Sequence, residues 1–144
     1  MEIIRATTLA EQAGAYYVRI QAMARKHKIP LCTEFDQHDT PTTKYIVAID
    51  DFLPVATCRL YALDNENVCI GRVVVLPEYR RQGLGTRVVN EAEQWARELG
   101  YKQAIVESRD NKVHFYETLG YTIYDSQKIV GKTFICIKMR KQLI

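Results

Sequence analysis

The stretch that decides the fold of this chain is Val73-Val74-Val75-Leu76-Pro77-Glu78-Tyr79-Arg80-Arg81-Gln82-Gly83-Leu84-Gly85-Thr86. Its β-branched start predicts a strand, which Pro77 ends because proline has no backbone N–H to donate. The two glycines then open a helix, and Gly100 ends it. The apolar stripe of this helix consists of Leu84, Val88, Val89, Ala92, Trp95, Ala96 and Leu99.

The glycine loop has the features of an anion site. Glycine lets backbone N–H groups approach a ligand closely, and the dipole of the following helix favours negative charge at its start. Arg80 and Arg81 add two positive charges beside Gly83 and Gly85. We therefore expect a phosphorylated ligand at this loop, with a pyrophosphate as the natural guest.

Length and composition are those of one ordinary domain. The chain has 144 residues, 47% hydrophobic and 26% charged, which predicts a single domain over 1–144. No apolar run approaches the roughly 20 residues that span a membrane. The net charge of +3 is too small to indicate nucleic acid as a partner. The first residues lack a signal-peptide pattern, so a cytoplasmic location is expected. The four cysteines have no Cys-x-x-Cys spacing, and free thiols are expected.

The rest of the chain predicts a mixed sheet. Strand patterns cover 2–6, 44–49, 53–63, 68–76, 102–107, 121–125 and 129–139, and helical patterns cover 9–28, 84–99 and 111–119. Gly71 is a candidate bulge. A strand-helix-strand unit connects 68–76 to 102–107 and favours parallel pairing. The expected fold class is therefore α/β, with a mostly antiparallel mixed sheet and one central parallel strand-helix-strand unit.

The first helix and the loop after it carry further candidates. The predicted apolar face of the helix consists of Leu9, Ala13, Tyr16, Tyr17, Ile20, Met23, Ala24 and His27. Residues 29–43 are irregular and carry Glu34, Asp36 and Asp39. A loop of this length inside a compact domain is often functional. These acidic residues either border a pocket or form a solvated surface loop.

The central stretch resembles the GNAT superfamily of N-acetyltransferases. The superfamily pattern Arg/Gln-x-x-Gly-x-Gly/Ala is matched by Arg80-x-x-Gly83-x-Gly85. The resemblance extends to the valine-rich strand before the loop and to the later segment Phe115-Tyr116-x-x-x-Gly120-Tyr121. It implies the acyl-CoA N-acyltransferase fold and acetyl-coenzyme A (acetyl-CoA) as cosubstrate.

The resemblance also implies where acetyl-CoA lies. Its pyrophosphate would rest on the amides of the glycine loop, and its pantetheine arm would pair with the strand before the loop. A backbone N–H near Val74 or Val75 would donate to the thioester oxygen, an interaction worth ~3 kcal/mol in other acyl-transfer sites. The implied cofactor-binding residues are Val73, Val74, Val75, Arg80, Arg81, Gln82, Gly83, Leu84, Gly85, Thr86 and Asn111.

The resemblance also implies that Tyr116 donates a proton to the leaving group. Tyrosine at this position protonates the departing thiolate in the family. The reference pKa values of phenol and thiol, about 10 and 8.5, are close enough for assisted transfer. The alternative is a tyrosine of the core, because Phe115, Tyr116 and Tyr121 cluster in the sequence.

The attacking amine needs a general base. Some family members carry a glutamate on the strand before the loop, but residues 70–76 contain no carboxylate. The candidates are Glu34, Asp36 and Asp39 on the long loop and Glu107 on the strand after the central helix. Glu34 and Asp36 are also the candidates for binding a cationic amine, because segment 30–36 resembles one that borders the acceptor pocket in a bacterial subgroup.

The function expected is N-acetyl transfer from acetyl-CoA to a primary amine by direct attack, with no metal. The alternative is a domain that binds acetyl-CoA without turnover, as a sensor or interaction module. A dinucleotide site is disfavoured because Val88 occupies the third glycine position, and no Gly-Lys-Ser/Thr triphosphate loop occurs. The acceptor stays open, and the chain is expected to be a monomer or a homodimer.

Overall fold

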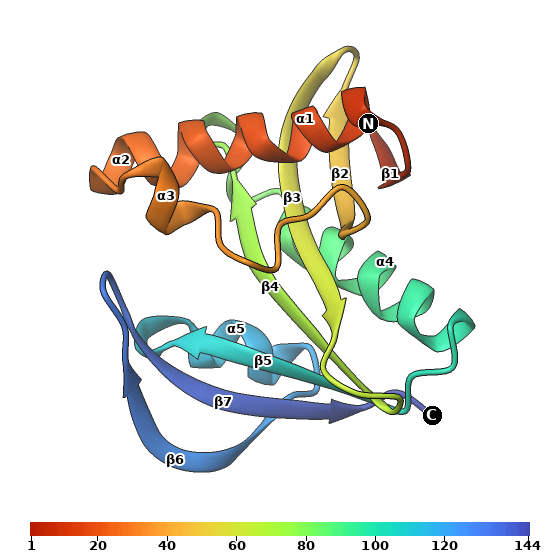
Figure 1. Cartoon of the computed structure of the whole chain (residues 1–144), viewed down its shortest axis with the longest axis vertical. Helices are drawn as coiled ribbons and strands as arrows, with labels where there is room; N and C mark the ends of the chain where they lie inside the picture. Colours follow the sequence, from red (N-terminus) through yellow and green to blue (C-terminus); the bar gives the residue numbers. More distant parts are fainter.

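The computed structural model describes all 144 residues. The chain forms one seven-stranded sheet with helices on both faces (Figure 1). The strands are β1 (Glu2–Ala6), β2 (Lys44–Asp50), β3 (Leu53–Ala62), β4 (Asn67–Val75), β5 (Gln103–Arg109), β6 (Thr122–Val130) and β7 (Ile135–Gln142), in the order β1-β2-β3-β4-β5-β7-β6. Only β4 and β5 pair in parallel; every other neighbouring pair is antiparallel. The expected fold class is confirmed.

The helices form two layers. The first layer contains α1 (Leu9–Arg19), a π-helical turn (Ile20–Ala24), α2 (Arg25–His27) and α3 (Leu31–Glu34). The second contains α4 (Leu84–Glu98) and α5 (Val113–Thr118), which lie behind the sheet in Figure 1. Two 3₁₀ turns, η2 (Pro77–Tyr79) and η3 (Asp110–Lys112), precede α4 and α5. No helix is long and apolar enough to cross a membrane.

The main core lies between the sheet and α4. Val88, Ala92 and Ala96 of α4 are fully buried against Ile46 of β2 and Ile70 of β4. Trp95 is half-buried and Leu99 is exposed at the end of the predicted stripe. The predicted helix over 84–99 is therefore confirmed, with its apolar face against the sheet.

The predicted apolar face of the first helix is only partly correct: Ala24 is buried and Tyr16 packs against the core, as predicted. Leu9 and Tyr17 are exposed, whereas Ala15, Val18 and Ala22 are fully buried. Small residues face the sheet because the helix approaches it closely, and a Cβ added to Gly14 would lie 3.1 Å from Pro54 Cγ. The start of the helix was predicted correctly, since Thr8 and Glu11 form a capping box.

The C-terminal hairpin turns later than the sequence predicts. The predicted break at 126–128 lies inside β6, and the turn lies at 131–134. Asp125 Oδ1 accepts a hydrogen bond from the backbone N–H of Gln127 at 2.9 Å, and the β6–β7 register shifts between Asp125 and Ile129. The polar residues therefore form an irregularity within the strand instead of a turn.

Candidate active site

The parallel pair β4–β5 separates after three residues. Asn67 to Cys69 pair with Gln103 to Ile105, and no further residue of β4 faces β5. If the register continued, Gly71 would lie opposite Glu107. The diverging strands, visible in Figure 1, leave one edge of Val73–Val75 without a strand partner. We call the region between residues 71–75 of β4 and 107–109 of β5 the β4–β5 opening.

A bulge bends β4 at the start of this opening. Thr57 of β3 pairs with Val74 and Arg59 pairs with Gly71, so β4 holds one residue more than β3 over this interval. Arg72 takes a left-handed backbone angle φ of 50° in the bulge. The bulge predicted at Gly71 therefore exists, and its strained residue is the next one.

The glycine loop joins the upper end of β4 to α4. Arg81 and Gly83 have left-handed φ values of 63° and 76°. The N-terminus of α4 has no side-chain cap, in contrast to the capping box of α1. The first N–H groups of α4 therefore have no side-chain acceptor, and they lie where the helix dipole favours an anion.

The other predicted cofactor residues surround this loop. Arg80, Arg81 and Gln82 are exposed, and Arg80 Nε donates to Val75 O at 3.4 Å. Leu84 is buried, so only its backbone faces the loop, and Thr86 is half-buried in the first turn. A Cβ added to Gly85 would meet the Phe115 ring at 3.4 Å. Asn111 is exposed in η3, before α5.

Tyr116 reaches the β4–β5 opening from α5. Its side chain is buried against Phe115 and Tyr121, with ring centroids 5.0 and 5.7 Å away. Its hydroxyl makes no hydrogen bond to another protein group. Burial raises the pKa of this phenol above its ordinary value, and the nearby thiols of Cys58, Cys69 and Cys136 raise it further. The phenol is therefore a protonated donor without a protein acceptor.

Glu107 of β5 acts electrostatically on two of these three thiols, those of Cys69 and Cys136. Burial raises the pKa of Cys69 and of Cys136, and the charge of the Glu107 carboxylate adds to each increase. Glu107 itself is exposed and forms no ion pair. Tyr116 and Glu107 thus both lie near Cys69 and Cys136, where β4 and β5 separate.

The acidic residues of the long loop are paired with arginines. Glu34 is buried in α3, and its Oε2 lies 2.9 Å from Arg19 Nε. Asp39 binds Arg19 at 2.6 Å and Arg59 at 3.0 Å. Asp36 binds Arg59 at 2.9 Å and Arg72 at 3.2 Å. These six residues form what we call the arginine–carboxylate cluster, and its three acids are matched by three guanidinium groups.

This pairing changes what the loop acids can do. Burial opposes the ionisation of Asp39, but hydrogen bonds from Arg19 and Tyr45 outweigh it and hold the pKa of that carboxyl far below its usual range. Asp36 also has a lowered pKa, because the N–H of His38 and Arg59 outweigh its desolvation. The solvated-loop alternative is thus wrong for Glu34 and Asp39. Glu34 and Asp39 are both buried and paired with Arg19, which disfavours them as a base and as a site for an ammonium group, whereas Asp36 is paired but partly exposed.

Sequence reasoning missed the three arginines. Arg19 is fully buried, and it falls on the inward stripe that Ala15 and Val18 of α1 form with Ala22 of the π-helical turn. Arg59 is buried in the middle of β3, and its Nε is a buried side-chain nitrogen without a hydrogen-bond partner. An arginine at a core position of a helix or strand is the signal that could have found them, because such residues are rarely buried unpaired.

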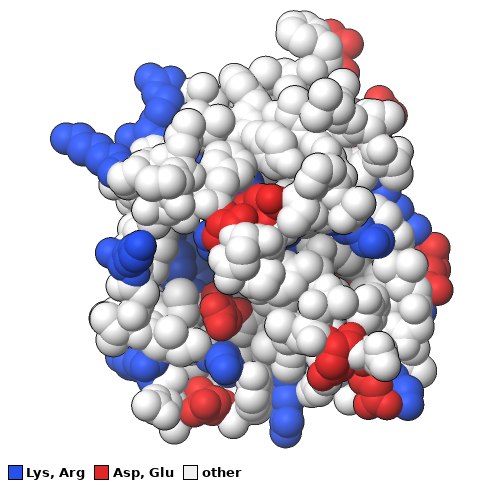
Figure 2. All heavy atoms as spheres, in the orientation of Figure 1, with Lys and Arg blue, Asp and Glu red and all other residues white.

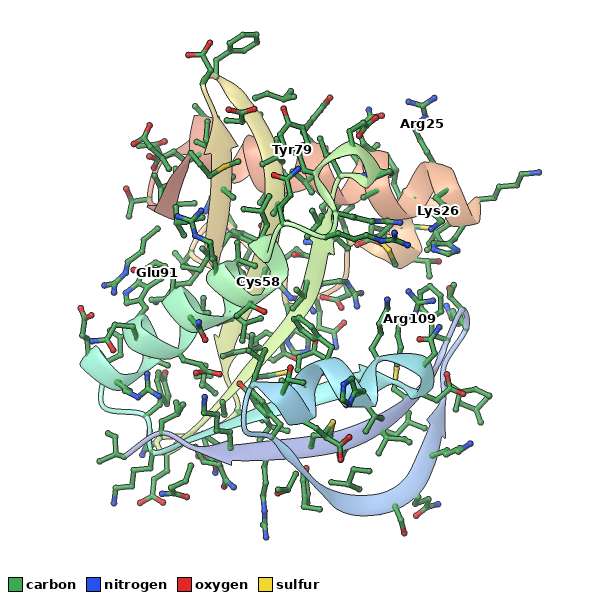
Figure 3. All side chains as sticks on the ribbon, turned by 180° about the vertical axis from the view of Figure 1, so that it is seen from behind. Arg25, Lys26, Cys58, Tyr79, Glu91 and Arg109 are labelled. Carbon is green, nitrogen blue, oxygen red and sulfur yellow. The ribbon has the colours of Figure 1, made fainter.

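Basic residues gather at the mouth of the opening. Figure 2 shows basic side chains around a hollow between the α2–α3 region and the β6–β7 hairpin. Seen from behind in Figure 3, Arg109 and Lys26 lie on opposite sides of this space. Arg109 lies 3.9 Å above the Phe134 ring, and that ring packs against His27 at 5.3 Å. Burial lowers the pKa of His27, and Arg109, Lys26 and Arg80 lower it further.

Known proteins match the chain in both sequence and fold. Residues 8–121 match the Acetyltransferase (GNAT) family. An uncharacterised acetyltransferase of Streptococcus pyogenes is 33% identical over 94 residues, which are 65% of this chain and 64% of that protein. A crystal structure from Lactobacillus plantarum, provisionally described as an N-acetyltransferase, has 28% identity and a TM-score of 0.92, covering 99% of this chain and 98% of that one.

A structure with a bound ligand shares the fold at lower identity. A GNAT family acetyltransferase from Elizabethkingia anophelis, solved with acetyl-CoA bound, has 17% identity and a TM-score of 0.70. The two chains cover 98% and 97% of each other. Nearly the whole length of the present chain therefore adopts the fold of that protein.

Proposed function

Because the chain belongs to the GNAT family of acetyltransferases, we propose that it transfers the acetyl group of acetyl-CoA to a primary amine. One observation carries the proposal: a strand edge without a partner, an uncapped helix start and a buried phenol without an acceptor meet at the β4–β5 opening. Each of these is an unfilled hydrogen-bonding position that a thioester with a phosphorylated arm can fill.

The main chain is proposed to hold the cosubstrate. The uncapped N–H groups at the start of α4 accept the pyrophosphate, with Arg80 and Arg81 adding positive charge. The pantetheine arm pairs with the free edge of Val73–Val75 like one more strand, since β5 has left that edge. Asn111 in η3 is proposed as a further contact. The structure of a protein with the same fold and with acetyl-CoA bound supports acetyl-CoA as the ligand.

The acetyl transfer is proposed to proceed by direct attack. The amine nitrogen forms a bond to the thioester carbon, and a backbone N–H near Val74 or Val75 donates to the oxygen as it gains negative charge. The carbon–sulfur bond then breaks, and Tyr116 gives its proton to the sulfur. The high pKa of Tyr116 keeps that proton in place until the thiolate forms.

Glu107 is the proposed general base. Among the candidates from the sequence, Glu34, Asp36 and Asp39 are held by arginines, whereas Glu107 is exposed and unpaired. It lies on β5 at the level where the opening begins, near the same thiols as Tyr116. A carboxylate in this position accepts the amine proton directly or through one water molecule. Asp36, whose side chain is 27% exposed, is retained as a proposed acceptor contact.

We also propose that the chain works as one domain in the cytoplasm, as a monomer or a homodimer. The small net charge of +3 supports an acceptor other than nucleic acid. The match to the Streptococcus pyogenes relative spans 64% of that protein, so its description does not fix the acceptor.

Calorimetric titration with acetyl-CoA, followed by thiol release over a panel of amines, tests the proposed function. Binding with release on one class of amine is expected. Binding without release on any amine would favour an acetyl-CoA-binding sensor or interaction module. No binding would contradict the assignment of the loop and of the β4 edge.

A further inference from the structure

Arg72 occupies the point where the cofactor strand leaves the sheet. It is the extra residue of the β4 bulge, directly before Val73–Val75, and its φ is 50°. A non-glycine residue is strained in this region, so the surrounding structure must hold it there. Its conformation sets the direction in which the following residues face the opening, because one residue of slip turns a strand over.

The side chain of Arg72 is bound to the opposite side of the site. Nε and Nη2 donate to the backbone oxygen of Glu34 at 3.3 and 3.2 Å. Nη2 also donates to Asp36 Oδ2 at 3.2 Å. Arg72 is the only arginine of the cluster that is partly exposed, with 34% of its side chain accessible. It therefore joins the bulge to the segment that follows α3.

The partners of Arg72 are themselves fixed. Arg19 holds Glu34 through its carboxylate and through its backbone oxygen, at 2.9 and 2.7 Å. Arg59 holds Asp36 at 2.9 Å. Arg72 therefore contacts two residues that the buried arginines Arg19 and Arg59 already hold in place. We call residues 35–43 the acidic loop.

We propose that Arg72 is a positioning residue that couples the acidic loop to the cofactor strand, so that occupation of the β4 edge strengthens the contacts of Arg72 with Glu34 and Asp36 and further stabilises the loop. This inference rests on the proposed function. Coenzyme A bound along Val73–Val75 fixes the bulge, and the fixed bulge holds the guanidinium against Glu34 and Asp36. The acceptor then meets a loop that is already in place. Arg72 itself touches neither reacting group.

Hydrogen exchange with and without coenzyme A tests this coupling without knowledge of the acceptor. In the wild type, coenzyme A is expected to slow amide exchange both in 73–76 and in the acidic loop. In Arg72→Gly, glycine keeps φ near 50° without strain, so protection of 73–76 remains while the added protection of the loop falls about tenfold, a usual size for coupled sites.

Two further variants separate coupling from a general loss of structure. Arg72→Lys keeps the charge and the backbone strain but loses the two-pronged contact, and it is expected to restore part of the loop protection. Arg5→Gln removes another half-exposed arginine that has two carboxylate partners, Glu91 and Glu98, and it is expected to behave as the wild type. Once an acceptor is found, Arg72→Gly should raise its KM more than it changes the affinity for coenzyme A.

Equal loop protection in the wild type and in Arg72→Gly would overturn the inference. So would binding of coenzyme A to the wild type that leaves exchange in the acidic loop unchanged. Absence of coenzyme A binding to the wild type would instead overturn the proposed function, and this inference with it.

Discussion

The two sides of the β4–β5 opening are built from different chemistry. The side of the glycine loop offers backbone groups: the free edge of Val73–Val75 and the uncapped start of α4. The side of the acidic loop is built from charged side chains, the six residues of the arginine–carboxylate cluster. Damage to the first should therefore change ligand affinity, whereas damage to the second should change stability and the position of the loop.

Arg19→Met should have the largest effect, and it should fall mainly on stability and on the position of the acidic loop. Arg19 is fully buried, and its loss leaves Glu34 and Asp39 without their shared partner. Breaking a buried ion pair costs about 4 kcal/mol of unfolding free energy, measurable by urea denaturation. Affinity for coenzyme A should fall by at most about tenfold, the size expected for the coupling through Arg72, because backbone groups are proposed to hold the ligand. Arg5→Met, at a surface ion pair, should cost at most about 1 kcal/mol. Equal losses in the two variants would show that the cluster is not a buried clamp.

Gly83→Val should have the next largest effect, and it should fall on the ligand. Valine is strained at φ 76°, so the loop must change its backbone and lose its N–H directions. Affinity for acetyl-CoA should fall about 100-fold in calorimetry, the size expected for removing several charge-assisted hydrogen bonds.

Gly100→Val is the matched control for the loop. Gly100 has φ 92° and, like Gly83, open space around its Cα, but it lies at the far end of α4. The two variants should lose similar stability, and only Gly83→Val should lose affinity. Unchanged affinity in Gly83→Val would mean that the loop does not bind the pyrophosphate.

Tyr116→Phe should have a smaller effect, confined to turnover. The hydroxyl has no protein partner, so its removal should leave the fold and the affinity for acetyl-CoA unchanged, while thiol release slows about tenfold. Tyr121→Phe removes a neighbouring hydroxyl that donates to Glu93 at 2.9 Å, and it should lower stability without slowing release. If the two variants released thiol at the same rate, Tyr116 would be a packing residue.

Lowering the pH should gradually reduce the stability that the arginine–carboxylate cluster contributes. The pKa values of Asp36 and Asp39 are lowered in the folded protein, so both carboxylates stabilise it fully above their unfolded pKa of about 3.9. That contribution is lost as pH falls from about 4 towards their folded pKa values. Urea unfolding from pH 6 to pH 3 should show this decline, and Asp39→Asn should flatten it. An equal slope in that variant would assign the acid sensitivity to other groups.

The same contrast explains what could be predicted from the sequence. Backbone sites leave local signals, and the β-branched run at 73–75 and the glycines at 83 and 85 predicted the strand, the loop and the helix correctly. The parallel β4–β5 pairing followed from the connecting helix. The bulge was also detectable, because Gly71 interrupts the strand pattern.

Side-chain sites depend on contacts between distant residues. Arg19, Arg59 and Asp39 come from α1, β3 and the acidic loop, and nothing local reveals that they meet. Glu34 was a candidate base because its charge is visible in the sequence, whereas its burial against Arg19 is not. The apolar face of the first helix was predicted only in part for a related reason: close packing placed small residues inward, where the pattern favoured large ones.

The most direct test of this account is single-turnover thiol release by Glu107→Gln, with the affinity for acetyl-CoA measured on the same sample. Glu107 is the candidate acid without an arginine partner, and glutamine keeps its size. We expect thiol release to slow roughly 300-fold, which is within the range for loss of a general base, while the affinity for acetyl-CoA stays unchanged. Release at the wild-type rate with wild-type affinity would contradict the assignment of Glu107 as the general base, because the base would then lie elsewhere.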